Sequence, residues 1–231
     1  MKVALFHGNP RKGNTYRAAG LFMDELRKCG GVECAEFFMP TDLPAFCVGC
    51  QRCLSGRHDK CPNAAYVAPI LTAIINADAL VFATAHCGGS GMPGAMKNLI
   101  DHLDFLTLLV SHRDEMFGKK AFIITTGTGS TGAIKPITGA LRHWGVNRVY
   151  SVGLRMFTNA WDKMPAARQA GFENRLRRNA RKFYNAKKKR PYLSTVLFFT
   201  ISKFILKRYV GEGSYPYELW RERGYFRKRP F

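Results

Sequence analysis

Four closely spaced cysteines are the most conspicuous reactive residues of this 231-residue chain. Cys47, Cys50, Cys53 and Cys61 form the spacing C-x2-C-x2-C-x7-C. Thiolates at such short intervals crowd around one centre, as in ferredoxin cluster motifs, whereas structural zinc sites usually join one C-x2-C pair to a distant second pair. The spacing therefore favours an iron–sulfur cluster over zinc. A structural or redox-active group of thiols stays open as an alternative.

A glycine-containing stretch near the start, G-N-P-R-K-G-N-T at 8–15, could bind an anion. It leaves an apolar run and enters an amphipathic segment, so the free N–H groups of a helix's first turn would face it. Gly8 and Gly13 would let the backbone approach a ligand, and Arg11 or Lys12 would add positive charge. Polar side chains would come from Asn9, Asn14 and Thr15. The stretch matches neither the P-loop pattern nor G-x-G-x-x-G, so it predicts a phosphate site of another kind. A loop that is simply capped by Asn14 is the alternative.

Apolar runs alternate with helical patterns along the first two thirds of the chain. The expected strands are 2–7, 32–38, 79–84, 120–127 and 146–154, and the expected helices are 14–29, 64–76, 93–110 and 133–145. This alternation predicts an α/β fold, a doubly wound five-stranded parallel sheet with strand order 2-1-3-4-5. In such a sheet the loops after strands one, three and four should converge on a ligand.

The positive charge is concentrated in the second half of the chain. Residues 1–110 carry a net charge of +1, and residues 111–231 carry +19. We therefore expect one domain at 1–158 and a basic, partly helical C-terminal extension at 159–231. A basic helix should run into a charged linker near 187–190. An extension of this kind could contact nucleic acid, a membrane surface or an acidic partner, or could simply be a solvated face.

The apolar segment 192–206 is interrupted by Lys203 and is too short to span a bilayer. It could lie on a membrane surface, but packing on the core or on a second subunit is the favoured interpretation. The aromatic and basic residues that alternate near the C-terminus are compatible with binding single-stranded nucleic acid. The first residues lack the features of a signal peptide, so we expect a cytoplasmic protein.

Three loops together resemble those of flavodoxin-like, NAD(P)H-dependent FMN reductases. The first is the 8–15 stretch, in which Asn9 stands where that family usually has Ser. The second is A-D-A-L-V-F-A-T-A-H-C-G-G-S-G-M-P-G-A-M-K-N-L-I-D-H-L at 77–103, and the third is T-T-G-T-G-S-T-G-A at 125–133. The similarity covers roughly 1–155. It departs from the family after the third strand, where Ala85-His86-Cys87 replaces a Pro-x-Tyr whose aromatic ring normally covers the flavin.

The resemblance implies that FMN is bound by these loops. Its phosphate would lie on Asn9, Arg11, Gly13, Asn14 and Thr15. Its isoalloxazine ring would lie against two further groups of residues: Thr84, Ala85, His86, Cys87, Gly88 and Gly89 after the third strand, and Thr126, Gly127, Thr128 and Gly129 after the fourth. Backbone N–H groups of these loops can tune the flavin's electronics.

The cysteine spacing is similar to that of the iron–sulfur flavoproteins, a branch of the same fold. The resemblance implies a [4Fe–4S] cluster on Cys47, Cys50, Cys53 and Cys61 that exchanges electrons with FMN. Cluster-free FMN reductases carry similar cysteines as loop structure or as thiols near the flavin, so both interpretations stay open.

The predicted activity is that of a flavin-dependent oxidoreductase. FMN would accept hydride from NAD(P)H and pass electrons to a small-molecule or protein acceptor, and no side chain is needed as a general acid or base. One alternative is an FMN electron carrier that does not use NAD(P)H. Another is a redox-responsive protein that binds nucleic acid or membrane through its basic tail. The resemblance also implies a homodimer.

Overall fold

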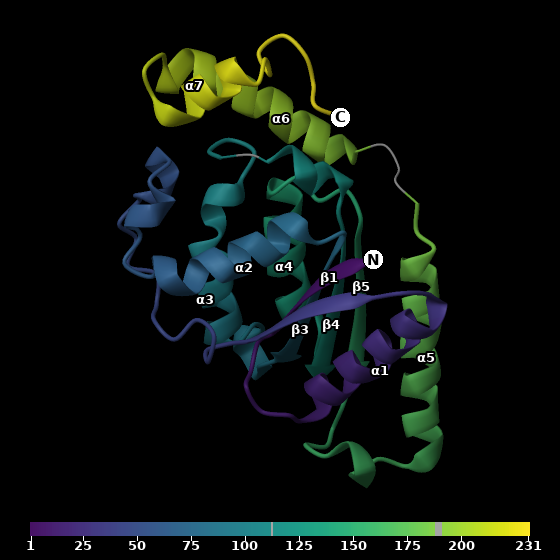
Figure 1. Ribbon diagram of the computed structural model, residues 1–231. Helices are drawn as coiled ribbons and strands as arrows, with labels where there is room; N and C mark the ends of the chain where they lie inside the picture. The colour runs from purple at the N-terminus through teal and green to yellow at the C-terminus, as the bar shows by residue number, and fades with distance from the viewer. Residues whose placement is uncertain (112, 188–190) are drawn as a thin grey trace.

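Five strands form one parallel sheet. The computed structural model describes residues 1–111, 113–187 and 191–231. The strands are β1 (Lys2–His7), β2 (Glu33–Phe38), β3 (Ala79–His86), β4 (Lys120–Gly127) and β5 (Val149–Arg155). They lie in the order β2-β1-β3-β4-β5, and every neighbouring pair is parallel (Figure 1). The predicted doubly wound sheet and its strand order are confirmed.

Helices cover both faces of the sheet (Figure 1). On one face lie α1 (Asn14–Cys29) and α5 (Ala166–Tyr184), and on the other lie α2 (Ala64–Asn76), α3 (Gly94–His102) and α4 (Thr131–His143). The central strands each contain a continuous apolar stretch, such as Ala79–Ala83 in β3 and Ala121–Ile124 in β4, because both of their faces are covered. Along β3, Leu80 and Phe82 join the core under α2, α3 and α4, whereas Val81 and Ala83 join the core under α1 and α5.

The helix predicted at 93–110 is wrong in length, because α3 ends at His102. Leu103, Phe105, Leu106 and Leu108 are all buried. Four positions so close together point in all directions around a helix, and one helical face cannot bury them all. The chain therefore turns after α3 through a short 3₁₀ segment, Asp104–Leu106, which sends these side chains inward by another route.

The C-terminal residues form a basic helical extension, as predicted. Helix α5 packs on α1 and adds Leu176, Ala180 and Phe183 to the sheet's core. Beyond it lie α6 (Leu193–Ile205), which continues as a π-helical turn (Leu206–Val210), and α7 (Tyr215–Glu222). The division at residues 158 and 159 stays a prediction. Most of the expected charged linker, residues 188–190, lies outside the described residues.

A separate small core holds the extension together. Trp220 is fully buried, stacks on Phe199 with ring centroids 4.6 Å apart, and donates its indole N–H to the Leu108 carbonyl at 3.0 Å. Leu206 and Tyr225 complete this cluster. In the described part of the chain, no helix has the length and apolar character needed to cross a bilayer.

Candidate functional site

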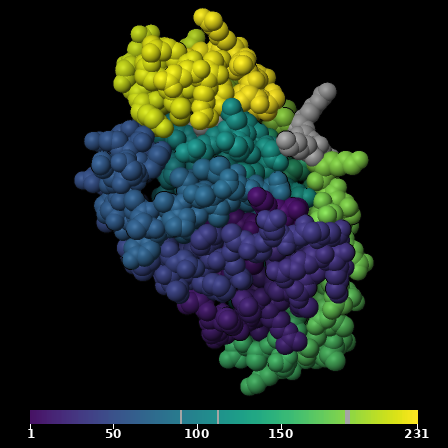
Figure 2. All heavy atoms as spheres, in the orientation of Figure 1, coloured from purple at the N-terminus to yellow at the C-terminus, as the bar shows by residue number. Residues whose placement is uncertain are grey.

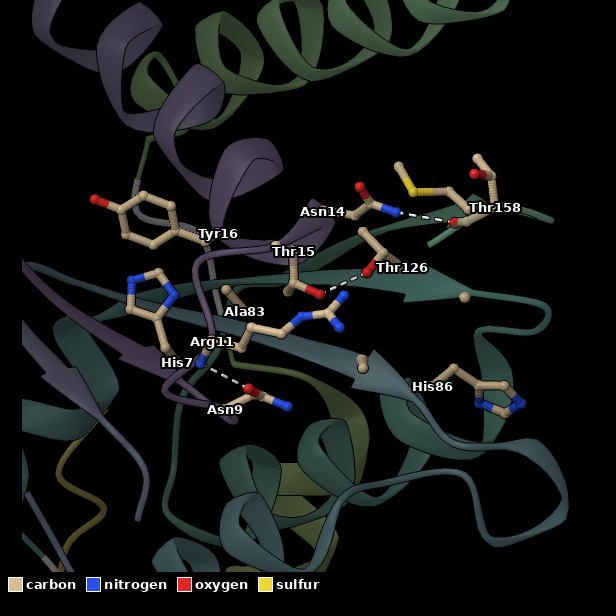
Figure 3. A pocket seen from close by; sticks show the side chains of 14 residues that line it. His7, Asn9, Arg11, Asn14, Thr15, Tyr16, Ala83, His86, Thr126 and Thr158 are labelled. Carbon is tan, nitrogen blue, oxygen red and sulfur yellow. Dashed lines mark hydrogen bonds between the residues drawn. The ribbon is translucent and has the colours of Figure 1, made fainter. Parts of the chain in front are cut away.

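A pocket of about 320 Å³ opens at the carboxyl edge of the sheet (Figure 3). Its wall is formed by the carboxyl ends of β1, β3 and β4, by the loop after β1 with the first turn of α1, and by the loop after β5. Its lining residues are His7, Asn9, Arg11, Gly13, Asn14, Thr15, Tyr16, Ala83, Ala85, His86, Thr126, Gly127, Met156 and Thr158. A ligand site is expected at this edge of a doubly wound sheet, where the chain connections of β1 and β3 diverge.

The loop after β1 leaves the sheet in a tight turn. The amide of Gly8 donates to the Ala83 carbonyl at 2.8 Å, and the amide of Arg11 donates to Asn9 Oδ1 at 2.8 Å. A Cβ atom on Gly8 would lie 2.6 Å from Thr84 Oγ1, so a glycine is required there for the loop to lie on β3. The turn therefore delivers the first residues of α1 to the pocket.

The N-terminus of α1 is suited to bind an anion. The described residues supply no side-chain cap to this helix end, and no acidic residue lies in its first turn. The amides of the first turn are therefore available to a ligand, and their partial positive charge favours an anion. The Arg11 side chain lies over Gly13, where a Cβ atom would come within 3.0 Å of Arg11 Nε.

Side-chain hydrogen bonds join the loops around the pocket. Thr15 Oγ1 and Thr126 Oγ1 lie 2.5 Å apart, which connects α1 to the end of β4. Asn14 Nδ2 donates to the Thr158 carbonyl at 3.0 Å, so Asn14 holds the loop after β5 instead of capping its own helix (Figure 3). An ion pair of 2.5 Å between Arg17 and Asp162 fastens the same loop further along.

Glycines allow the carboxyl end of β3 to lie close to the end of β4 and its following loop. Gly127 has a φ of 139°, and a Cβ atom there would lie 2.8 Å from the His86 carbonyl oxygen. A Cβ atom on Gly129 would lie 2.4 Å from His86 Nε2. Among the described atoms, the buried His86 Nδ1 has no hydrogen-bond partner. The imidazole of His86 thus lies against the glycines of the β4 loop, at the side of the pocket away from His7 (Figure 3).

The opposite side of the pocket has a buried histidine. His7 Nε2 lies 2.7 Å from Glu36 Oε1, and its ring stacks on Phe38 with centroids 4.5 Å apart. Burial lowers the pKa of His7, although the hydrogen bond and the charge of Glu36 act in the other direction. Tyr16 lies beside His7, with ring centroids 5.4 Å apart. This wall is aromatic and polar at once.

The structure brings together nine of the residues expected at the flavin. Those that line the pocket are Asn9, Arg11, Gly13, Asn14, Thr15, Ala85, His86, Thr126 and Gly127. Those that do not line it are Thr84, Cys87, Gly88, Gly89, Thr128 and Gly129. Thr84 is buried beneath Gly8, and Cys87 pairs through its backbone with Gly91 in a turn that extends beyond the pocket.

Five lining residues were not anticipated: His7, Tyr16, Ala83, Met156 and Thr158. Met156 and Thr158 follow β5, and residues that line a ligand site are expected at the carboxyl end of any strand in such a sheet. His7 and Tyr16 border the first loop, but their sequence patterns are those of a buried strand and of an ordinary helix. Only the pairing of β1 with β2, which brings Glu36 and Phe38 alongside, distinguishes His7 from a core residue.

The four-cysteine loop forms a second, smaller pocket. Cys47, Cys50, Cys53 and Cys61 all line it, together with His58 and His102. It shares no lining residue with the larger pocket. Cys47 and Cys50 are exposed, whereas Cys53 and Cys61 are half-buried, and burial raises the pKa of the Cys53 thiol.

Two polar residues fix this loop to the rest of the chain. The amide of Cys47 donates to Asn98 Oδ1 at 3.0 Å, and Asn98 Nδ2 donates to the Ala45 carbonyl at 2.9 Å. Asn63 Nδ2 donates to the Phe46 carbonyl at 3.1 Å. Across the described ranges, no group of three or more His, Cys, Asp or Glu side chains is placed to hold a metal ion. The thiols thus share a pocket, but the structure does not support the predicted cluster.

The fold and the pocket define a flavodoxin-like protein. Its solved structural neighbours include the azoreductase AzrA, at 14% identity and a TM-score of 0.61, covering 79% of this chain and 100% of that one. An azoreductase from Bacillus anthracis str. Sterne has 14% identity and a TM-score of 0.60, with 79% and 100% covered. The NAD(P)H:quinone oxidoreductase from Methanothermobacter marburgensis has 15% identity and a TM-score of 0.61, with 80% and 98% covered.

The sequence itself gives the family. Residues 1–165 match the model of the NADPH-dependent FMN reductases, so this chain belongs to that family and is an oxidoreductase. No curated protein matches the chain.

Proposed function

We propose that this protein binds FMN in the pocket at the carboxyl edge of the sheet and uses it to pass electrons from NAD(P)H to a small-molecule acceptor. The observation that carries the proposal is the α1 N-terminus, which has no side-chain cap among the described residues and opens into that pocket beside Arg11. The membership of residues 1–165 in the FMN reductase family supports the same ligand. When bound, the flavin supplies the hydride and electron chemistry.

The chain's own residues have two tasks at the phosphate end. The amides of Asn14 and Thr15 and the Arg11 guanidinium would bind the phosphate, and Asn9 would keep the turn in shape through its hydrogen bond to the Arg11 amide. Neither task needs a carboxylate, and none lines the pocket among the described residues. The site is therefore positively charged where a phosphate dianion would lie.

At the ring end, Ala85, His86, Thr126 and Gly127 would position the isoalloxazine. The close contact between Gly127 and the His86 carbonyl leaves backbone at the surface of this wall. The usual aromatic cover after β3 is missing from the sequence. We propose that His86 supplies a planar surface there, because its ring is held against Gly129 and lines the pocket. The acceptor would reach the exposed edge of the ring.

Flavin binding and its phosphate contact can be tested together. Purified protein should bind FMN and turn yellow, and NADPH or NADH should bleach the flavin absorbance under argon. Arg11→Gln should weaken FMN binding about 10- to 100-fold, because it removes a charge-assisted hydrogen bond to the phosphate. It should leave riboflavin binding unchanged, because riboflavin has no phosphate. Lys12→Gln is the matched control, since Lys12 is exposed beside Tyr16 and does not line the pocket.

Three results would contradict the proposal. If the purified protein does not bind added FMN, the proposal is wrong. Equal losses of FMN and riboflavin affinity in Arg11→Gln would place the phosphate elsewhere. Flavin that binds but is not reduced by NADPH or NADH in a stopped-flow experiment would favour the electron-carrier alternative.

A [4Fe–4S] cluster on Cys47, Cys50, Cys53 and Cys61 is the finer version of this proposal. Its support is the spacing of the four cysteines in the sequence. Anaerobic reconstitution with iron and sulfide should then give about four irons per chain and a broad visible absorbance. The double substitution Cys50→Ala with Cys53→Ala should abolish both. If that variant retains all of its iron, the cysteines do not bind a cluster and are structural residues of the loop. The homodimer is proposed on the resemblance alone, and light scattering measures it.

A further inference from the structure

Helix α6 exposes its apolar residues to solvent. Leu193, Leu197, Ile201 and Phe204 are 87%, 61%, 43% and 60% exposed. Their spacing of four, four and three residues places them along one stripe of the helix. Tyr209, 74% exposed, stacks edge-on against Phe204 and extends the stripe into the π-helical turn. Isolated exposed leucines are ordinary, but a continuous apolar stripe indicates a surface that contacts another molecule or a membrane.

The buried face of the same helix contains two polar side chains. Thr195 and Ser202 are each 1% exposed, and their hydroxyl oxygens have no hydrogen-bond partner among the described residues. Phe199 and Leu206 are the apolar residues that anchor this face on the small C-terminal core. A helix selected only to pack on its own domain would bury the leucines and expose the hydroxyl groups. Here two of the four hydroxyl groups of α6 are buried, while Leu193 and Leu197 are exposed, so the outward face has a use of its own.

Cations lie next to the apolar stripe. Lys203 is on α6, and Lys207 and Arg208 are exposed directly after it. Across residues 191–231 there are eight Lys and Arg residues against three Glu, and the whole chain carries a formal charge of +20. A surface that is apolar along its centre and cationic at its edge complements an apolar layer bordered by negative charge.

We propose that α6 and the turn after it dock this protein on an anionic lipid surface. The helix has 13 residues and is therefore about 20 Å long, which is too short to cross a bilayer but suits a helix that lies in the interface. Leu193, Leu197, Ile201 and Phe204 enter the acyl boundary. Lys203, Lys207 and Arg208 pair with lipid phosphates or carboxylates.

A second copy of this chain is the less suitable occupant. A symmetric contact through α6 would bring the same cations of two copies together, and each copy carries the same excess of positive charge. Like charges facing each other across an interface oppose association. An anionic bilayer instead attracts these cations and accepts the leucines.

The docking surface and the FMN pocket lie at opposite ends of the molecule. Helix α6 packs on the C-terminal end of α4, where Phe198 stacks on His143 with ring centroids 4.6 Å apart. The pocket lies at the other end, among the loops where the strands finish (Figure 1). Figure 2 shows the C-terminal atoms gathered into a lobe at one extremity. Docking would therefore hold the protein on a membrane and leave the pocket open to solution.

Vesicle sedimentation with the full chain tests the proposal without reference to flavin. Vesicles of phosphatidylcholine with 30% phosphatidylglycerol should bind the protein, and salt should weaken the binding. Pure phosphatidylcholine vesicles should bind at least tenfold more weakly. Leu197→Gln with Phe204→Gln should lower the partition coefficient at least tenfold, because two buried side chains are lost from the lipid. Tyr66→Gln, an exposed aromatic on α2, is the control and should bind normally.

A second pair of variants tests the charge. Lys203→Gln, Lys207→Gln and Arg208→Gln together should lower binding to anionic vesicles about a hundredfold. The control variant carries Lys163→Gln, Arg178→Gln and Lys182→Gln, three exposed cations outside α6. Its partition coefficient on anionic vesicles should be within a few-fold of that of the original protein. Unchanged urea unfolding midpoints in all variants would show that folding is intact.

Two results would overturn the proposal. If the original protein and both α6 variants bind anionic vesicles equally, the exposed face of α6 does not contact lipid. Absence of vesicle binding, together with a dimer in light scattering that Leu197→Gln with Phe204→Gln converts to a monomer, would assign the face to a second copy of the chain.

Discussion

Gly127 offers the sharpest test of how the loops form the pocket. Its φ of 139° lies where residues with a side chain are rarely found, and holding such a residue there costs about 1–3 kcal/mol. An added Cβ atom would also lie 2.8 Å from the backbone oxygen of His86, which cannot rotate away as a side chain could. That clash adds about 1–3 kcal/mol to the cost. The unfolded chain of the alanine variant acts in the opposite direction and offsets up to about 1 kcal/mol, because alanine has fewer unfolded conformations than glycine. We expect Gly127→Ala to lower the free energy of unfolding by about 2–4 kcal/mol.

The assay is urea unfolding followed by tryptophan fluorescence, with a thermal melt beside it. For a chain of this size, 2–4 kcal/mol corresponds to a fall in melting temperature of about 5–15 °C. Gly139→Ala is the matched control: Gly139 lies within α4, and a Cβ atom there would have no neighbour within 4 Å. That control should stabilise the chain by up to about 1 kcal/mol, because alanine favours helix more than glycine does. If Gly127→Ala unfolds at the same urea concentration as the original, the close approach of the β3 and β4 loops is not as described.

Two more predictions concern pH and the C-terminal core. Burial lowers the pKa of His7, so the unfolded chain takes up more protons than the native chain as the pH falls through the usual histidine value of 6.5. Stability should therefore decrease between pH 7.5 and 5.5, and His7→Gln should make that decrease smaller in urea titrations. Parallel slopes for His7→Gln and the original protein would contradict this. Trp220→Leu should lose the hydrogen bond to the Leu108 carbonyl and part of a fully buried cluster, at a cost of about 2–4 kcal/mol. Hydrogen exchange should then quicken in α6 and α7 but not in β1, β3 and β4, and uniform quickening throughout the chain would show that the C-terminal core is not a separate unit.

The strands and most helices could be predicted because each has one strong periodic signal. β1, β4 and α1 occupy the predicted residues. The helix predicted to reach residue 110 shows what local periodicity does not determine. A run of leucines reads as one apolar helix, yet Leu103, Phe105 and Leu106 are buried on different sides of a turn, which depends on what surrounds them.

The end of the pocket that we propose for the phosphate could be predicted better than the rest. Asn9, Arg11, Gly13, Asn14 and Thr15 are contiguous, so one local motif contains the whole group. The ring end depends on which part of each long loop turns inward. Gly88 and Gly89 lie in the expected loop after β3 but do not line the pocket, because the backbone pairing of Cys87 with Gly91 directs that turn away from it.

The sequence by itself determined the order of the strands and the edge of the sheet where ligand-binding loops gather, because alternating strands and helices with right-handed crossovers leave few other arrangements. Only the tertiary structure decided that His7 pairs with Glu36, that Asn14 holds the loop after β5, and that α6 turns its leucines outward. Periodicity shows that a helix or strand has two different faces. Which neighbour covers each face depends on contacts between residues far apart in the chain, and those contacts leave no local pattern.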